Sequence, residues 1–166
     1  MRVLHFYKTA LPDTMGGVEK VIDQIASGAT KLGVKTDVLS LTPERLPRTI
    51  EIDGYLVHRA RLDMEIASTG FSMSAFWRFA QLAKKADVVH YHFPWPFMDV
   101  VHFATIVKKP TVVTYHSDII RQKSLHKIYR PLQRKFLGDV SRIVATSPNY
   151  LATSDVLANY KHKVSV

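Results

Sequence analysis

Apolar positions along the chain follow two spacings, one typical of β-strands and the other of α-helices. Short apolar runs predict strands at residues 2–7, 36–41, 87–92, 111–115 and 142–146. Apolar residues three and four apart predict helices at residues 18–32, 74–86 and 97–107, within 119–138 and within 148–161. Strands that alternate with helices form βαβ units. We therefore expect an α/β fold, with a Rossmann-like parallel sheet and helices on both of its faces.

Three shorter segments complete this expectation. Ile50–Ile52 and Tyr55–His58 flank the dipeptide Asp53-Gly54, which is a strong signal for a β-hairpin. Residues 61–72, which contain several Ser, Thr and Gly residues, are expected to form a loop. Residues 164–166 are expected to begin a further strand.

The composition fits one globular domain and excludes several kinds of site. The chain has 166 residues, of which 46% are hydrophobic and 22% charged. It has no cysteine, so disulfides, cysteine-ligated zinc and thiol nucleophiles are excluded. The first apolar run is too short for a signal peptide, and no apolar stretch has the length of a membrane span.

The positive charge is concentrated in one segment. Lys and Arg outnumber Asp and Glu by 23 to 14, a net charge of +9. Six basic residues fall in an acid-free stretch of the predicted helix: Arg121, Lys123, Lys127, Arg130, Arg134 and Lys135. The same stretch carries residues at the spacing of an inward face: Leu125, Ile128, Tyr129, Leu132 and Phe136. The cations either form a solvated face or attract an anionic partner, such as a membrane, a phosphorylated lipid or nucleic acid.

The turn between the first strand and the first helix contains Gly16-Gly17. Backbone N–H groups and the helix dipole favour an anion at such a turn, and glycine lets a ligand approach the backbone. The turn lacks both the dinucleotide fingerprint and the P-loop motif. A phosphate site and an ordinary turn both remain open on this local pattern.

Histidines gather near the ends of two predicted strands. His90 and His92 are two positions apart in one strand and therefore share a face, while His116 ends the next strand and is followed by Ser117 and Asp118. Three histidines can form a metal site. Hydrogen-bonded strand histidines explain the pattern equally simply, and because no spacing typical of a metal motif accompanies them, we expect no metal.

Aromatic residues follow the predicted strand at residues 87–92, and others occur on the predicted helix that precedes this strand. Trp95 lies in the rigid segment Phe93-Pro94-Trp95-Pro96-Phe97, where it either stacks on a sugar or an apolar chain, or caps the core. The predicted helix 74–86 carries two apolar stripes, more than one buried face needs. One stripe consists of Met73, Phe76, Trp77 and Ala80. The other consists of Phe79, Ala83 and Ala86. Core packing is the simpler explanation for the second surface, and contact with lipid or acceptor is the alternative.

Four segments in order carry a resemblance to a known family. They are Met15–Glu19, Asp87–His92, Val113–Asp118 and Ile143–Tyr150. Together they resemble the N-terminal domain of the family 4 glycosyltransferases, which are retaining, two-domain enzymes of the GT-B type. The resemblance covers essentially the whole chain, so residues 1–166 would form a single acceptor-side domain, without the C-terminal domain that holds most of the nucleotide-sugar.

The resemblance implies a reaction and site residues. A hexose would pass from a nucleotide-diphosphate sugar to a hydroxyl with retained configuration. Gly16 and Gly17 would approach the donor diphosphate and His116 would lie beside the reacting sugar. Acceptor contacts would fall on His92, Trp95, Ser117 and Asp118. The nucleotide-diphosphate sugar would serve as co-substrate, and no cofactor or metal is expected.

The implied acceptor is a membrane-associated or lipid-linked saccharide of surface polysaccharide synthesis. We expect the enzyme to act in the cytoplasm as a peripheral protein at the inner face of the cell membrane, held by the basic helix. Two other functions stay open. One is a nicotinamide-dependent oxidoreductase, against which the missing fingerprint counts. The other is a non-catalytic module for acidic lipid or nucleic acid, which would leave the Gly-Gly turn and the aromatic segment unused; we therefore expect no nucleic-acid partner.

Overall fold

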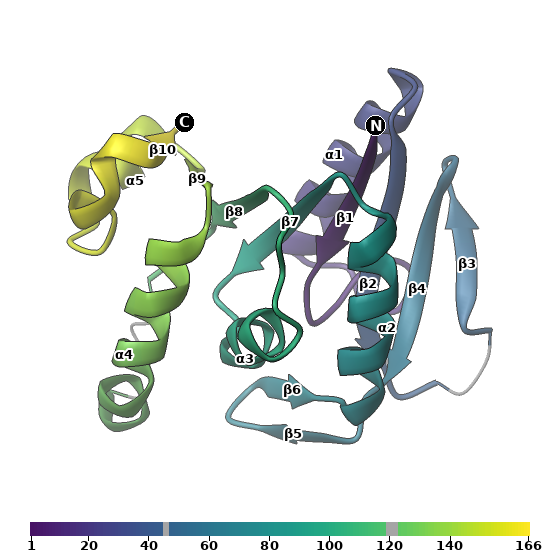
Figure 1. Cartoon of the computed structure of the whole chain (residues 1–166), viewed down its shortest axis with the longest axis horizontal. Helices are drawn as coiled ribbons and strands as arrows, with labels where there is room; N and C mark the ends of the chain where they lie inside the picture. Colours follow the sequence, from purple (N-terminus) through teal and green to yellow (C-terminus); the bar gives the residue numbers. More distant parts are fainter. Residues whose placement is uncertain (45–46, 119–122) are drawn as a thin grey trace.

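The strands of this protein form an eight-stranded sheet and a small separate hairpin (Figure 1). The computed structural model describes residues 1–44, 47–118 and 123–166. The strands are β1 (Arg2–Phe6), β2 (Lys35–Thr42), β3 (Thr49–Ile52), β4 (Tyr55–Arg61), β5 (Met64–Ile66), β6 (Thr69–Phe71), β7 (Val88–Phe93), β8 (Thr111–Tyr115), β9 (Arg142–Ala145) and β10 (Val164–Ser165). The helices are α1 (Gly17–Lys31), α2 (Met73–Lys85), α3 (Pro96–Ala104), α4 (Lys123–Asp139), α5 (Pro148–Thr153) and the 3-10 helix η1 (Leu157–Lys163).

The strand order explains where a ligand can bind. The sheet runs β10-β9-β8-β7-β1-β2-β4-β3, and its strand pairs are parallel except for β3 with β4. The chain builds outward from β1 in one direction, through β2 to β4, and then returns to build in the other direction from β7. The order therefore reverses between β1 and β7, and ligands of open α/β sheets bind outside the carboxyl ends of the strands at such a reversal.

Alternating side chains assign the two faces of the sheet. Phe6 and Tyr91 both pack against Phe79 of α2, which places α2 on their face, and α1 lies behind the sheet in the same view (Figure 1). His5 and His90 are neighbours in register on β1 and β7 and project from the opposite face. The predicted fold class, a Rossmann-like parallel sheet with helices on both faces, is confirmed.

The hairpin prediction at Asp53-Gly54 is confirmed, and a second hairpin was missed. Asp53 and Gly54 both have positive φ, at 45° and 85°, as a two-residue type I′ turn requires. Residues 61–72 were expected to form a loop but contain the hairpin of β5 and β6. Its turn residues, Ala67 and Ser68, also have positive φ, 52° and 60°. Neither residue is typical of a type I′ turn, so the sequence carried no signal for it.

The two amphipathic helices differ in part from their predicted faces. In α2, Phe79 is buried, and Phe76 of the other stripe packs on Phe97, whereas Met73 and Trp77 of that stripe are exposed. The surplus stripe is therefore divided between the core and the surface. In α4, Phe136 faces the core, but Ile128 is 79% exposed, and the prediction that it points inward is wrong. The inward face of α4 runs instead through residues that follow Tyr129 at intervals of three and four: Leu132, Gln133, Phe136 and Leu137.

Helix ends carry the expected signals. The Ser72 hydroxyl accepts a hydrogen bond from the backbone N–H of Ala75 at the start of α2, and Ser147 caps α5 in the same way. α3 and α5 each begin with proline, which tolerates the first helical position. Among the described residues, no helix is both long and apolar enough to cross a membrane.

Candidate active site

The Gly-Gly turn lies at the carboxyl end of β1, where α1 begins. Gly16 is the N-cap residue, with φ −124° and ψ −173°, and Gly17 is the first helical residue. A Cβ on Gly16 would lie 2.6 Å from Oε2 of Glu19, whereas a Cβ on Gly17 would meet no heavy atom within 4 Å. Gly16 is therefore needed for the close approach of a carboxylate, while the space beside Gly17 is open. Neither residue has positive φ, so the backbone conformation itself does not require glycine at this turn.

The carboxylate of Glu19 lies against the start of α1. Thr14 donates a hydrogen bond to it through Oγ1 at 2.9 Å. Burial alone would raise the pKa of Glu19, but hydrogen bonds from its own backbone N–H, from Thr9 and Thr14, and from the backbone N–H of Gly16 outweigh burial and lower it. An ionised carboxylate thus already engages the Gly16 N–H, and a bound phosphate would have to share the turn with it.

Histidines from three neighbouring strands form a continuous chain at the reversal of strand order. Nδ1 of His5 lies 3.1 Å from Nε2 of His92, and Nδ1 of His92 lies 3.1 Å from Nε2 of His116. The rings of His92 and His116 stack with centroids 5.4 Å apart. His90 stacks on His92 and contacts His5 in a tilted arrangement, and its Nε2 lies 2.8 Å from Oγ1 of Thr114. The structure therefore joins the three predicted histidines and adds His5.

The environment keeps these imidazoles neutral. Burial and the neighbouring histidines lower the pKa of His92 well below its usual value, and burial and His90 do the same for His5. Burial, with a contribution from His116, lowers the pKa of His90 to about 4, and burial lowers that of His116. A neutral imidazole donates through one nitrogen and accepts through the other. The tautomer of His116 is therefore linked, through His92, to that of His5.

Three of the histidines also form the cluster in which a metal is conceivable. One nitrogen each from His5, His90 and His92 lies within 4.8 Å of the others. Neutral imidazoles are good ligands for zinc and similar ions. However, His5 and His92 direct ring nitrogens at each other, and His90 directs Nε2 at Thr114. The expectation that the protein uses no metal stays a prediction.

Two predicted acceptor residues lie in the interior. His92 is 0% exposed and Trp95 is 1% exposed. The indole of Trp95 packs on Phe6 and donates through Nε1 to the backbone carbonyl of Gly70 at 3.1 Å, which ties the β5–β6 hairpin to the core. Neither side chain is accessible to an acceptor in this structure, so direct contact is not supported here and the assignment stays a prediction. His92 contacts His116, and Trp95 packs in the core.

The other two predicted acceptor residues differ in their surroundings. Ser117 is exposed at the carboxyl edge of the sheet. Asp118 accepts hydrogen bonds from the hydroxyls of Tyr115 at 2.7 Å and Ser154 at 3.2 Å, and its backbone N–H donates to the hydroxyl of Tyr150. These bonds join β8 to the segment around α5. Asp118 thus links two elements of the fold while remaining half-buried, and Ser117 is exposed; contact of either with an acceptor stays a prediction.

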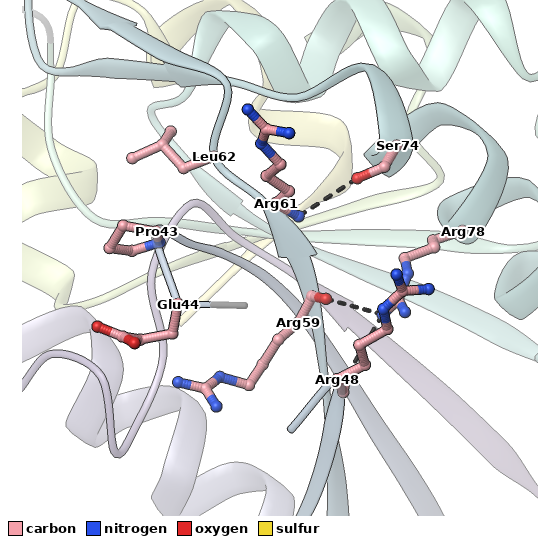
Figure 2. Close-up of a pocket in the computed structure, with 8 residues that line it drawn as sticks. All are labelled: Pro43, Glu44, Arg48, Arg59, Arg61, Leu62, Ser74 and Arg78. Carbon is pink, nitrogen blue, oxygen red and sulfur yellow. Dashed lines mark hydrogen bonds between the residues drawn. The ribbon is translucent and has the colours of Figure 1, made fainter. Parts of the chain in front are cut away.

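Two adjoining cavities extend along the carboxyl edge from α1 to α2. The first, about 740 Å³, reaches from Thr14 and Glu19 beside the Gly-Gly turn to Gly70 on the hairpin. The second, about 640 Å³, is shown in Figure 2 and is lined mainly by arginines: Arg48, Arg59, Arg61 and Arg78. Pro43, Glu44 and Leu62 line both cavities. Together they form a groove from the start of α1 to the start of α2.

The basic helix α4 lies at the opposite side of the molecule from α2 and β4 (Figure 1). Lys127, Arg130, Arg134 and Lys135 are exposed, beside the exposed Ile128. The ammonium of Lys135 lies 4.6 Å from the ring centroid of Phe103, a cation–π contact. Arg121 lies outside the described residues, as does the side chain of Lys123. The predicted surface is thus present at the remaining four cations.

Comparison with known proteins identifies the family. The model of Glycosyltransferase Family 4 matches residues 15–164. The chain belongs to glycosyltransferase family 4. All four segments that carried the resemblance lie within this match, and so do Gly16, Gly17, His92 and His116.

Two curated members of the family resemble the chain over its whole length. It is 58% identical over 166 residues to D-rhamnosyltransferase WbpZ of Pseudomonas aeruginosa, and 46% identical over 166 residues to O-antigen chain mannosyltransferase C of Escherichia coli. The chain covers 44% and 45% of those proteins, so it spans less than half the length of the curated relatives that it matches.

Solved GT-B glycosyltransferases share the fold. Sucrose-phosphate synthase from Thermosynechococcus elongatus has a TM-score of 0.64 at 15% identity, over 91% of this chain and 44% of the synthase. An α-glucosyltransferase in complex with UDP has a TM-score of 0.60 at 14% identity, over 100% of this chain and 40% of the transferase. At these identities the likeness concerns the fold alone.

Sequence reasoning missed part of the candidate site. His5 was noticed only as part of a strand, although one histidine between Leu4 and Phe6 in an apolar run was a detectable signal. The arginines of the second cavity come from a loop, from β4 and from α2. No spacing in the sequence brings such positions together, so only the structure reveals that cavity.

Proposed function

We propose that this chain is the acceptor-side domain of a retaining glycosyltransferase. The enzyme would transfer a hexose from a nucleotide-diphosphate sugar to a membrane-associated or lipid-linked saccharide in surface polysaccharide synthesis. The observation that carries the proposal is the family 4 match over residues 15–164. The two curated relatives, a rhamnosyltransferase and an O-antigen mannosyltransferase, support a hexose as the transferred group and a polysaccharide as the product.

His116 would hydrogen-bond the reacting sugar or its leaving oxygen. Support comes from its position after β8, beside the reversal of strand order, and from its link to His92. Because the pKa of His116 is lowered by burial, the ring would act as a neutral hydrogen-bonding group rather than as a cation. His92 and His5 would fix its orientation and tautomer, which makes them positioning residues in this proposal.

The turn at Gly16 and Gly17 would approach the donor diphosphate, and helix N–H groups would stabilise charge that develops on the leaving phosphate. The open space at Gly17 supports this role. The cavity beside Glu19 would receive the acceptor, and Ser117, at the edge of the sheet, would contact it. No cofactor or metal is assigned, because the leaving diphosphate can be neutralised by helix ends and basic side chains.

The enzyme would act in the cytoplasm, at the inner face of the cell membrane. The exposed cations of α4 support this location, since each contributes about 1 kcal/mol of attraction near an anionic leaflet. Ile128 would add an apolar contact at the same surface.

The activity test is transfer of radiolabelled hexose into lipid-extractable material. A polypeptide that joins this chain to a family 4 C-terminal domain would be incubated with a panel of nucleotide-diphosphate hexoses and a membrane extract. We expect one or more donors to give product whose anomeric configuration, read by NMR, matches the donor. The 166-residue chain alone should give none, because the donor site spans two domains. Inverted configuration, or turnover by the single domain at the full rate, would contradict the proposal.

A further inference from the structure

The arginine-lined cavity carries more positive charge than the fold needs. Its lining contains four arginines and one carboxylate, that of Glu44 (Figure 2). Arg59 is only 7% exposed and is held by Asp13, whose carboxylate accepts from Nε at 2.9 Å and from Nη2. Arg61 reaches the carboxylate of Asp63 at 3.3 Å. These two arginines are therefore neutralised within the protein.

The other two arginines lack such partners. Arg48 and Arg78 form none of the ion pairs found among residues 1–44, 47–118 and 123–166. Nη1 of Arg78 donates to the backbone carbonyls of Arg59 at 2.8 Å and Arg48 at 3.3 Å, and the side chain of Arg48 extends towards Arg78 in Figure 2. Burial and the charge of Arg48 lower the pKa of Arg78. Two guanidinium groups close enough to repel each other thus line the same cavity.

A second feature lies beside this cavity on α2. Ser74 and Arg78 line the cavity, and Met73 and Trp77 occupy the adjacent row of the same helix. Met73 and Trp77 are both exposed, and the β5–β6 hairpin, next to the start of α2, exposes Met64 and Ile66 as well (Figure 1). We call these four side chains the apolar rim: Met64, Ile66, Met73 and Trp77. A cationic cavity next to an apolar rim fits an amphiphile with an anionic head.

We propose that the cavity binds the diphosphate of a lipid-linked acceptor through Arg48 and Arg78, with the lipid chain lying over the apolar rim. Guanidinium groups bind phosphate oxygens with paired, charge-assisted hydrogen bonds. The proposal rests on the proposed function, because it specifies the acceptor of that reaction.

The groove supplies the connection between head group and reaction. The arginine cavity shares Pro43, Glu44 and Leu62 with the larger cavity, which ends at Glu19 beside the Gly-Gly turn. A saccharide joined to a diphosphate in the arginine cavity can extend through the larger one towards the start of α1. A free membrane phospholipid, which carries no saccharide, would leave that cavity empty, and this is why we assign the acceptor lipid.

Tryptophan fluorescence provides a direct test on the 166-residue chain. The chain has two tryptophans, of which Trp95 is buried and Trp77 is 64% exposed. Titration with farnesyl diphosphate, a short soluble lipid diphosphate, should shift the emission of Trp77 to shorter wavelength as the chain covers it. Inorganic diphosphate should compete for the site without producing the shift, and farnesol should bind at least tenfold more weakly than farnesyl diphosphate.

Variants identify the head-group contacts. Arg48→Gln should weaken farnesyl diphosphate binding at least tenfold, and Arg48→Gln with Arg78→Gln should weaken it further. A matched control removes two exposed cations from the other end of α2, Lys84→Gln with Lys85→Gln, and should bind like the wild type. Arg78 also donates to two backbone carbonyls, so the double variant could lose stability. The melting temperatures of all variants are therefore compared with that of the wild type. If the double variant melts early, the binding result of Arg48→Gln alone tests the proposal.

Three results would overturn the proposal. The first is that Arg48→Gln and the lysine control bind farnesyl diphosphate with equal affinity. The second is that farnesol binds as tightly as farnesyl diphosphate. The third is that the chain binds phosphatidylglycerol vesicles through Arg48 and farnesyl diphosphate does not displace them. The last would assign the arginines to the membrane surface. None of these measurements involves a donor sugar. Failure of hexose transfer with intact lipid diphosphate binding would therefore count against the proposed reaction and not against this site.

Discussion

Acidification should destabilise this protein steeply, because three histidines are buried side by side in neutral form. The folded-state pKa values of His5, His90 and His92 all lie below the usual 6.5. Between that value and the lowered one, the unfolded chain binds a proton that the folded chain does not. Stability therefore rises with pH through this window and is lost as pH falls below 6.5.

The size of the effect follows from His90, whose pKa falls from 6.5 to about 4. Such a difference amounts to about 3 kcal/mol once the pH is below 4, because one pKa unit corresponds to about 1.4 kcal/mol. Asp99 acts in the opposite direction, since burial, opposed by a hydrogen bond from Tyr129, raises its pKa. His5 and His92 shift in the same direction as His90, so we expect a net loss of stability as the pH falls through this window, with Asp99 offsetting part of it.

Urea unfolding at half-unit steps from pH 7.5 to 4.5 measures the slope of stability against pH. His90→Gln removes one titrating group while its amide can still reach Thr114, so it should reduce the slope by about 1.4 kcal/mol per pH unit. His162→Gln, a change at an exposed position, should leave the slope unchanged. A free energy of unfolding that stays flat from pH 7.5 to 5, or identical slopes for the wild type and His90→Gln, would refute the reasoning.

Three further outcomes follow from the structure. In a two-domain polypeptide, Gly17→Val should lower turnover a hundredfold or more with little change in melting temperature, whereas Gly28→Val, equally open and in the same helix, should leave both unchanged. Asp13→Ala should cost about 3–5 kcal/mol in urea unfolding, because it leaves the buried Arg59 without its carboxylate. Reversing three cations of α4 to glutamate should weaken binding to anionic vesicles about a hundredfold at low salt, and the same change at three exposed cations around α1 should not. The α4 set is Lys127, Arg130 and Arg134. The control set is Lys20, Lys31 and Lys35. Equal loss in both sets would mean that only net charge matters.

Local chemistry explains which elements could be predicted. The strands and helices that bury one face show a clear spacing of apolar residues, and Asp53-Gly54 predicts the turn of its hairpin. The hairpin at Ala67 and Ser68 carries no such signal, because neither residue type favours the positive φ that it adopts there. Ile128 fits the spacing of an inward face but lies just outside the arc that faces the core, which a sequence pattern cannot locate to within one residue.

The candidate site divides in the same way. His90 and His92 share a face because strand geometry requires it, and this was predictable. The contribution of His5 depends on β1 lying beside β7, which is a property of strand order. The arginine cavity depends on three elements that meet at one edge of the sheet. Features that arise within one element could thus be found from the sequence, and features that arise between elements could not.

Under the proposed function, the groove separates two kinds of recognition that would interfere if they were mixed. Permanent cations near the reacting sugar would bind the donor diphosphate and the acceptor diphosphate without distinguishing them. Here the histidine chain is neutral, and Glu19 adds a negative charge at the start of α1. The unpaired arginines lie at the other end of the groove, beside α2. This separation of charge would orient a lipid-linked saccharide with its diphosphate away from the donor and its free end towards the start of α1.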